Sequence, residues 1–288
     1  MRVDLDASVF QNEPEWCVPL LWFGFVERHR VLVPSASHSA FRLWRQDLAP
    51  NLHAAITQAE QWSITAEASS PSKLHVIVAS PPVGEQMATT RAWQVLQRPY
   101  RLLLEDGVND RAFLLRMCGV HERAYLRRRF REEWLEADHG GGISSMPRRI
   151  GDLAERGEPL QVSCLFDSDA PEPASPSHQA NLLREVCVNS RIHHHQLARR
   201  AIENYLPRSA FERWISFAPN RAGKKERREA VDALFSAADR HHQKVKETVG
   251  AVGHMYADDT AMNDQDLQHE GGPAELGTFI RELIERVQ

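Results

Sequence analysis

The chain has 288 residues, of which 42% are hydrophobic and 26% charged, and its formal net charge is −4. This composition is typical of a folded protein with a sizeable core and room for two domains. The negative balance excludes an overall basic field that would attract polyanions. The longest apolar run, residues 18–26, is shorter than the about 20 residues that a membrane span needs. The four cysteines form no CxxC pair, which predicts reduced, buried thiols. The acidic N-terminus has no signal-peptide pattern, so we expect a cytoplasmic protein without a membrane partner.

Residues 1–98 predict a first domain of α+β type. Two short apolar runs, residues 31–33 and 73–79, are typical of strands. Helical spacing of apolar residues covers residues 39–62, with an interruption at Pro50, and residues 84–97. This segment carries no residue pattern with an evident chemical role, and docking of a partner is one role that it could serve.

Residues 99–207 predict an α/β domain, because strands alternate with helices in a way that favours a parallel sheet. The expected strands cover residues 100–104, 134–137, 162–166 and 192–197. The expected helices cover residues 109–117, 121–132, 143–156, 177–189 and 198–206.

Residues 208–288 predict a helical C-terminal region. Its helices are expected at residues 211–217, 224–250 and 275–287. Between them, the acidic and glycine-containing residues 257–272 are expected to be a loop or linker.

Two of the predicted strands end in carboxylates. The run LQVSCLFDSD places Asp167 and Asp169 directly after an apolar strand, and Glu105 follows the strand at residues 100–104. Residues i and i+2 of a strand point to the same side, and parallel strands place their carboxyl ends at one edge of the sheet. Carboxylates about 4 Å apart repel each other unless a proton or a cation lies between them. Hard oxygen ligands favour Mg²⁺ or Mn²⁺ at this edge.

The motif order LLLEDGVNDRAFL, ADHGGG, CLFDSD and RRAIENYLP resembles a TOPRIM domain over about residues 99–207. The sequence is similar in particular to the TOPRIM nucleases of the overcoming-lysogenization-defect (OLD) type and to related bacterial anti-phage defence effectors. The resemblance implies a Rossmann-like parallel sheet flanked by helices. It also implies Mg²⁺-dependent cleavage or transfer at nucleic-acid phosphodiester bonds.

The resemblance also implies roles for single residues. Glu105 matches the first-motif glutamate, which serves as a metal ligand or as a general acid and base. Asp110 matches the downstream acid of that motif, and Asp167 and Asp169 match the metal-binding pair. Glu203 matches the acid of the Glu-Asn-Tyr-Leu segment, which could complete a second metal site.

The chain departs from the family at the first motif. Family members usually have Glu-Gly, whereas this chain has Glu105-Asp106-Gly107. Either acid could therefore be the ligand, and we favour Glu105 because it directly follows the apolar strand.

Basic residues near the same edge are candidates for holding the substrate. They are Arg127, Arg128, Arg199, Arg200, Lys244 and Lys246, with Arg148 and Arg149 as further candidates. Each has a structural alternative, since an arginine-rich helix can be a solvated face and Arg199 or Arg200 can pair with Glu203. Similarly, Gly140–Gly142 is expected to be a strand-to-helix turn, and His193–His195 to be packed or solvated.

The sequence therefore favours a metal-dependent nuclease that acts in anti-phage defence on DNA or RNA. Because no Walker motif is present, a sensor ATPase is a candidate partner, as is a second copy of the chain. The alternatives are an RNA-processing enzyme, either a maturation ribonuclease or a primase-like protein, and a non-catalytic scaffold subunit of an ATPase complex.

Overall fold

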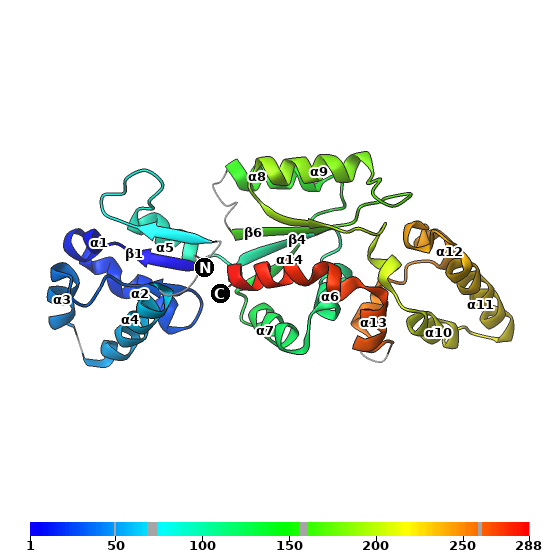
Figure 1. Cartoon of the computed structure of the whole chain (residues 1–288), viewed down its shortest axis with the longest axis horizontal. Coiled ribbons are helices and arrows are strands. Elements are labelled where there is room, and N and C mark those ends of the chain that lie inside the picture. Colours follow the sequence, from blue (N-terminus) through cyan, green and yellow to red (C-terminus); the bar gives the residue numbers. More distant parts are fainter. Residues whose placement is uncertain (49, 68–73, 156–160, 259–260, 288) are drawn as a thin grey trace. The chain divides into compact units, whose positions relative to one another are not determined.

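A computed structural model describes all residues of the chain except 49, 68–73, 156–160, 259–260 and 288. The chain divides into two compact units, which comprise residues 1–100 with 282–288 and residues 101–281 (Figure 1). The boundary predicted after residue 98 lies close to this division. Residues 208–281, expected as a separate helical region, belong to the same unit as residues 101–207.

The first unit contains a parallel three-stranded sheet in the order β2-β1-β3. The strands are β1 (Arg2–Leu5), β2 (Arg30–Leu32) and β3 (His75–Val78). The helices are α1 (Ala7–Asn12), η1 (Pro14–Trp16), α2 (Cys17–Phe25), α3 (Ser39–Gln46), η2 (Pro50–Leu52), α4 (His53–Glu67) and α5 (Thr89–Leu96). Parallel strands joined by helices make this unit α/β, so the expected α+β class is wrong. The strand β1 was not expected, although its residues alternate between polar and apolar side chains.

The second unit contains a four-stranded sheet in the order β5-β4-β6-β7. The strands are β4 (Tyr100–Leu104), β5 (Leu135–His139), β6 (Val162–Phe166) and β7 (His193–Gln196). The fully buried β6 is parallel to both β4 and β7, as expected for a strand covered on both faces. Leu104 is paired with Leu165, so the residues that follow β4 and β6 reach the same edge of the sheet.

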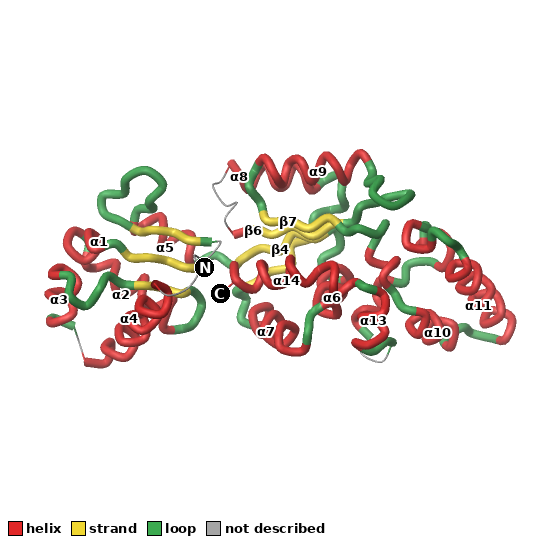
Figure 2. Tube along the Cα trace, in the orientation of Figure 1, coloured by secondary structure: helices red, strands yellow, loops and turns green. Residues whose placement is uncertain are grey.

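Helices cover both faces of this sheet (Figures 1 and 2). The helices that follow β4 in the chain, not all of which lie on the sheet, are α6 (Asn109–Met117), α7 (Val120–Arg131), α8 (Met146–Glu155), α9 (His178–Asn189), η4 (Ile202–Tyr205), α10 (Arg208–Ser216), α11 (Arg221–Ser236), η5 (Arg240–His242), α12 (Val245–Val249), η6 (Gly253–Ala257), α13 (Asp264–Glu270) and α14 (Gly272–Val287). On one face, α8 and α9 pack against Leu103, Val162, Cys164 and Phe166. On the other lie α6, α7 and α14, where Phe279 of α14 stacks on His193 of β7.

The prediction of a helix at residues 198–206 is wrong, because only the short 3₁₀ turn η4 forms there. The backbone N–H groups before η4 bond to distant partners instead of to helical carbonyls. Ala198 donates to the Glu275 carboxylate and Arg200 donates to the His241 carbonyl. Long-range partners of this kind leave no periodic signal in the sequence.

Two further expectations for the C-terminal region are also wrong. The helix expected at residues 224–250 is broken into α11, η5 and α12. The loop expected at residues 257–272 contains α13, which begins at an Asn263 cap whose side chain accepts from the Asp266 N–H. Reciprocal capping of this kind is a recognised helix-start signal, so α13 could have been predicted.

The four cysteines are buried free thiols, as predicted. Among the described residues, no helix combines the length and the apolar character that crossing a bilayer requires.

Candidate functional site

The carboxyl edge of β4 and β6 brings the first two candidate acids into contact. Glu105 follows β4 and Asp167 follows β6, and the Asp167 N–H donates to Glu105 Oε1 at 2.8 Å. The Asp167 carboxylate in turn accepts from the Ile202 N–H at 3.1 Å. Adjacent parallel strands therefore place these two acids together, with η4 beside them.

Asp110 and Glu203 belong to the same group of acids. Asp110 lies in the first turn of α6 and Glu203 lies in η4, and their side chains are buried, at 7% and 3% exposed. The charges of both raise the pKa of Asp167, which shows that they lie near it. We call Glu105, Asp110, Asp167, Asp169 and Glu203 the acidic cluster.

Burial and mutual repulsion raise the pKa values of three acids of the cluster, namely Glu105, Asp110 and Asp167. Burial raises the pKa of Asp167 well above its usual value, and the charge of Glu105 raises it further. Burial also raises the pKa of Asp110 to about 7, again with a contribution from Glu105. For Glu105, burial and the charge of Asp169 outweigh the hydrogen bond from Asp167 and raise the pKa. The cluster is therefore short of positive charge.

Lys246, near the start of α12, supplies positive charge to the acidic cluster. Its Nζ lies 3.3 Å from Glu203 Oε1. Burial alone would lower the pKa of Lys246, but the charges of Glu203, Asp167 and Glu105 outweigh burial and raise it. The lysine stays protonated and offsets part of the repulsion among the carboxylates.

Asp169 does not continue the strand geometry that we expected. Its φ is +48°, in the left-handed region that aspartate tolerates better than most residues. Its N–H donates to the Arg200 carbonyl at 2.8 Å, and the buried Ser168 hydroxyl bonds to the Arg199 carbonyl at 2.6 Å. The simple i, i+2 argument therefore fails at this turn, although the charge of Asp169 still raises the pKa of Glu105.

The structure separates Glu105 from Asp106. The Asp106 carboxylate accepts from the N–H groups of Val108 and Asn109 and from the Asn109 side-chain amide. These bonds outweigh burial and hold the pKa of Asp106 below its ordinary value. Asp106 thus shapes the loop before α6, while Glu105 belongs to the acidic cluster.

The segment from α12 to η6 forms a wall of the acidic cluster that we did not expect from the sequence. A Cβ atom at Gly253 would lie 3.0 Å from Glu203 Oε1, so a larger residue there would press on this carboxylate. The buried Tyr256 donates its hydroxyl to the Ile202 carbonyl at 2.7 Å. The spaced glycines of the stretch GAVGHMY were the one available signal for this close packing.

The donor atoms of the acidic cluster fit a divalent cation in their chemistry. Carboxylate oxygens are the ligands that Mg²⁺ and Mn²⁺ prefer, and the buried Glu203 Oε2 has no hydrogen-bond partner. Within the described part of the chain, however, no group of three or more acidic, histidine or cysteine side chains is arranged to hold a metal ion. Ligation would therefore require side-chain movement within the cluster.

Some of the candidate substrate-binding residues are already bound to other groups of the protein, whereas others have side chains exposed to solvent. Arg199 bonds to the Asn204 carbonyl and to Glu270 and stacks on Tyr205, so this internal network removes it from the candidates. Lys246 is committed to the acidic cluster. Four other candidates with exposed or half-buried side chains are Arg127, Arg128, Arg200 and Lys244. Two of them form ion pairs at the surface, Arg128 with Glu132 and Lys244 with Glu247.

Two other sequence patterns have structural roles. The glycines after β5 form the turn into α8, with Gly140 close to the Leu104 carbonyl. In β7, His193 Nδ1 lies 2.6 Å from the hydroxyl of Ser163 in β6, and His195 Nε2 lies 3.1 Å from Glu275 Oε1. Neither pattern points to a separate metal site.

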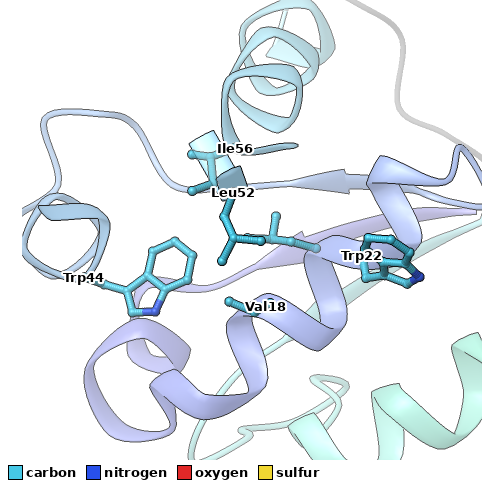
Figure 3. A pocket seen from close by; sticks show the side chains of 6 residues that line it. Val18, Trp22, Trp44, Leu52 and Ile56 are labelled. Carbon is cyan, nitrogen blue, oxygen red and sulfur yellow. The ribbon is translucent and has the colours of Figure 1, made fainter. Parts of the chain in front are cut away.

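The first unit contains an apolar pocket between its helices (Figure 3). Its lining consists of Val18, Leu21, Trp22, Trp44, Leu52 and Ile56. None of these six lining side chains is titratable, so they supply no group for acid–base or metal chemistry.

No family model, curated protein or solved structure matches the chain.

Proposed function

We propose that the chain is a Mg²⁺- or Mn²⁺-dependent nuclease that hydrolyses nucleic-acid phosphodiester bonds at the acidic cluster. The observation that carries this proposal is the convergence of buried carboxylates from two strand ends, α6 and η4, with Glu203 Oε2 left without a partner. Burying so much negative charge costs free energy unless a cation offsets it. A function that recruits a divalent cation supplies that compensation.

The residues of the cluster have distinct roles in this proposal. Glu105, Asp167 and Asp169 would hold one ion, and Asp110 and Glu203 would help to hold a second. A bound Mg²⁺ supplies a Lewis acid for a phosphate oxygen and lowers the pKa of a water towards neutrality. A cation bound beside Asp110 would lower its pKa from the value of about 7 in the metal-free protein, so Asp110 would bind the ion as a carboxylate.

The biological role and the partners in this proposal come from the resemblance to defence nucleases. We propose an effector that is controlled by a separate sensor ATPase. Copurification with the product of a neighbouring ATPase gene tests this part independently of the chemistry.

The test of the nuclease is a cleavage assay on single- and double-stranded DNA and RNA with Mg²⁺, Mn²⁺ or EDTA. Asp167→Asn should abolish cleavage, whereas Asp152→Asn, on the exposed side of α8, should leave it unchanged. Asp106→Asn should reduce cleavage far less than Glu105→Gln. Full cleavage by the Asp167 variant, or equal cleavage in EDTA, would refute the assignment.

A non-catalytic scaffold is the second candidate, and the position of Lys246 favours it. A lysine that already offsets the carboxylates lets the cluster exist without a metal ion. Titration calorimetry separates the candidates. Uptake of Mn²⁺ that Asp167→Asn abolishes supports the nuclease, and no uptake of either ion supports the scaffold.

A further inference from the structure

The N-terminal half of α11 presents a basic face outside the acidic cluster. Residues 221–228 contain five basic residues and one acid, within a chain whose net charge is −4. The spacing of Arg221, Lys224, Lys225 and Arg228 places them on one side of the helix, and they line a shallow hollow. All four side chains are exposed.

Neighbouring acids neutralise little of this charge. In the described residues, Arg221 and Lys224 have no ion pair. Lys225 and Arg228 lie 3.7 Å and 3.6 Å from Glu229 and Glu212, beyond good hydrogen-bond distance. Exposed pairs of this kind contribute little free energy, so the cations remain available to an external anion.

An exposed aromatic residue precedes the basic face in the chain. Phe217 follows α10, four residues before Arg221, and its side chain is 63% exposed. The Arg213 guanidinium lies 4.8 Å from the centre of the ring. An exposed ring among cations is the combination that binds unpaired bases together with their phosphates, whereas an acidic peptide would need only the charges.

The helix that carries the basic face packs against a helix that contacts the acidic cluster. Helix α11 packs between α10 and α12 (Figure 1), and α12 carries Lys246, whose Nζ lies 3.3 Å from Glu203. All of these elements belong to the unit of residues 101–281. A strand held on α11 would therefore be bound by the same compact unit that contains the cluster.

We propose that Phe217 and the basic face of α11 bind single-stranded nucleic acid, with the cations on the phosphates and the phenyl ring against a base. This inference rests on the proposed nuclease function, since it identifies the form of nucleic acid that the same unit engages. It assigns substrate binding to residues that none of the sequence motifs includes.

The first experiment measures the salt dependence of binding to a fluorescent mixed-sequence single strand in EDTA, where no cleavage occurs. The variant Arg221→Gln/Lys224→Gln/Lys225→Gln should reduce the slope of log K against log salt by about 2, since each lost contact to a single strand removes about 0.7. The matched control Arg42→Gln/Arg184→Gln/Arg191→Gln removes three exposed arginines outside α11 and should leave the slope unchanged. An unchanged slope in the α11 variant would overturn the proposal.

The second experiment tests the aromatic contact. Phe217→Ala should weaken binding of the single strand roughly 5- to 100-fold, and Phe217→Trp should restore it, because any base can stack on an aromatic ring. The same strand annealed to its complement should bind more weakly and should not respond to Phe217→Ala. An equal loss of affinity for the single strand and the duplex, or no loss of affinity for either, would count against a stacking role. Circular dichroism of each variant verifies that α11 is intact.

The outcomes separate this inference from the nuclease proposal. Asp167→Asn should lose cleavage while it retains binding in EDTA. If the wild-type protein binds single strands through α11 but cleaves nothing, the nuclease proposal fails and the binding surface stands. If it cleaves while the α11 and Phe217 variants bind and cleave normally, only the surface is refuted. Binding of anionic vesicles or polyglutamate in place of nucleic acid would also refute the surface.

Discussion

At the scale of single residues, Lys246 largely determines how the buried acids coexist. Its ammonium group lies against Glu203 and near Asp167 and Glu105, where a divalent ion would otherwise provide the positive charge. The lysine side chain is 60% exposed, so it can leave without crossing a packed core. A tethered cation of this kind stabilises the metal-free protein and must yield some of its contacts when a metal ion binds.

We expect Lys246→Met to lower the free energy of unfolding by about 1 kcal/mol in EDTA, because solvent screens an exposed partner. Stabilisation by Mn²⁺ should then be larger than in the wild-type protein, since the ion meets an uncompensated cluster. Thermal unfolding with and without the ion measures both effects. Lys244→Met is the control, because that lysine is exposed and pairs with the exposed Glu247, outside the acidic cluster. A wild-type response of the Lys246 variant would contradict this role.

The pKa of Asp110 predicts a pH dependence of stability. A carboxyl group whose pKa is raised to about 7 binds a proton more tightly in the folded than in the unfolded state. The stability that it contributes is therefore present at low pH and is lost as the pH rises through about 7. In EDTA, Asp110→Asn should stabilise the protein increasingly between pH 4 and 8, by up to about 4 kcal/mol. Urea unfolding at several pH values tests this, and parallel curves for the two proteins would exclude it.

At the scale of elements, the turn after β5 holds two layers of the second unit together. Gly140 lies where a Cβ atom would be 2.8 Å from the Leu104 carbonyl and 2.5 Å from Met146 Cγ, at the start of α8. A carbonyl at the end of β4 is fixed by the sheet and cannot move away. The glycine therefore permits the close approach of this turn to the strand that precedes Glu105.

We expect Gly140→Ala to destabilise the protein by roughly 1–3 kcal/mol through overpacking. Gly151→Ala, within α8, is the matched control, because a Cβ atom there meets no atom within 4 Å and alanine favours a helix. That variant should be neutral or slightly more stable. Denaturant unfolding of the pair gives the comparison, and equal stability of both variants would disprove the close-contact argument.

The elements differ in how well the sequence predicted them. The strands β4 and β6 were predicted nearly residue by residue, because each is a short, buried apolar run that ends at an acid. Residues 198–206 were predicted wrongly, because their backbone donors are satisfied by distant partners such as Glu275. The periodicity of apolar residues indicates which side of a single helix or strand is buried. The conformation of residues 198–206 depends instead on how several helices and strands pack together.

The same distinction applies to the acidic cluster. Glu105 and Asp167 could be placed together from the sequence, because they follow adjacent parallel strands. The position of Lys246 could not, because η4 and α12 meet through packing that no local pattern specifies. Gly253 and Tyr256 were missed for the same reason.

At the scale of the whole molecule, the cluster is assembled from segments far apart in the chain. Buried Arg116 of α6 donates to the Tyr256 carbonyl at 3.0 Å and to the Asp258 carbonyl at 2.8 Å. These bonds hold η6 against the helix that carries Asp110. The site therefore depends on the complete unit of residues 101–281, and truncation after residue 207 would remove Lys246 and η6 together.

Metal binding should consequently protect one unit and not the other. A ligand that binds only the folded state at 100 times its dissociation constant stabilises it by about 2.7 kcal/mol. Because the acids and Lys246 all lie in the second unit, Mn²⁺ should slow amide exchange around residues 105–110, 162–170 and 202–205. Residues 1–98 should exchange at an unchanged rate. Hydrogen–deuterium exchange with mass spectrometry measures this directly, with Asp167→Asn as the control that should lose the protection. Equal slowing in both units, or protection that persists in that variant, would show that the ion binds elsewhere.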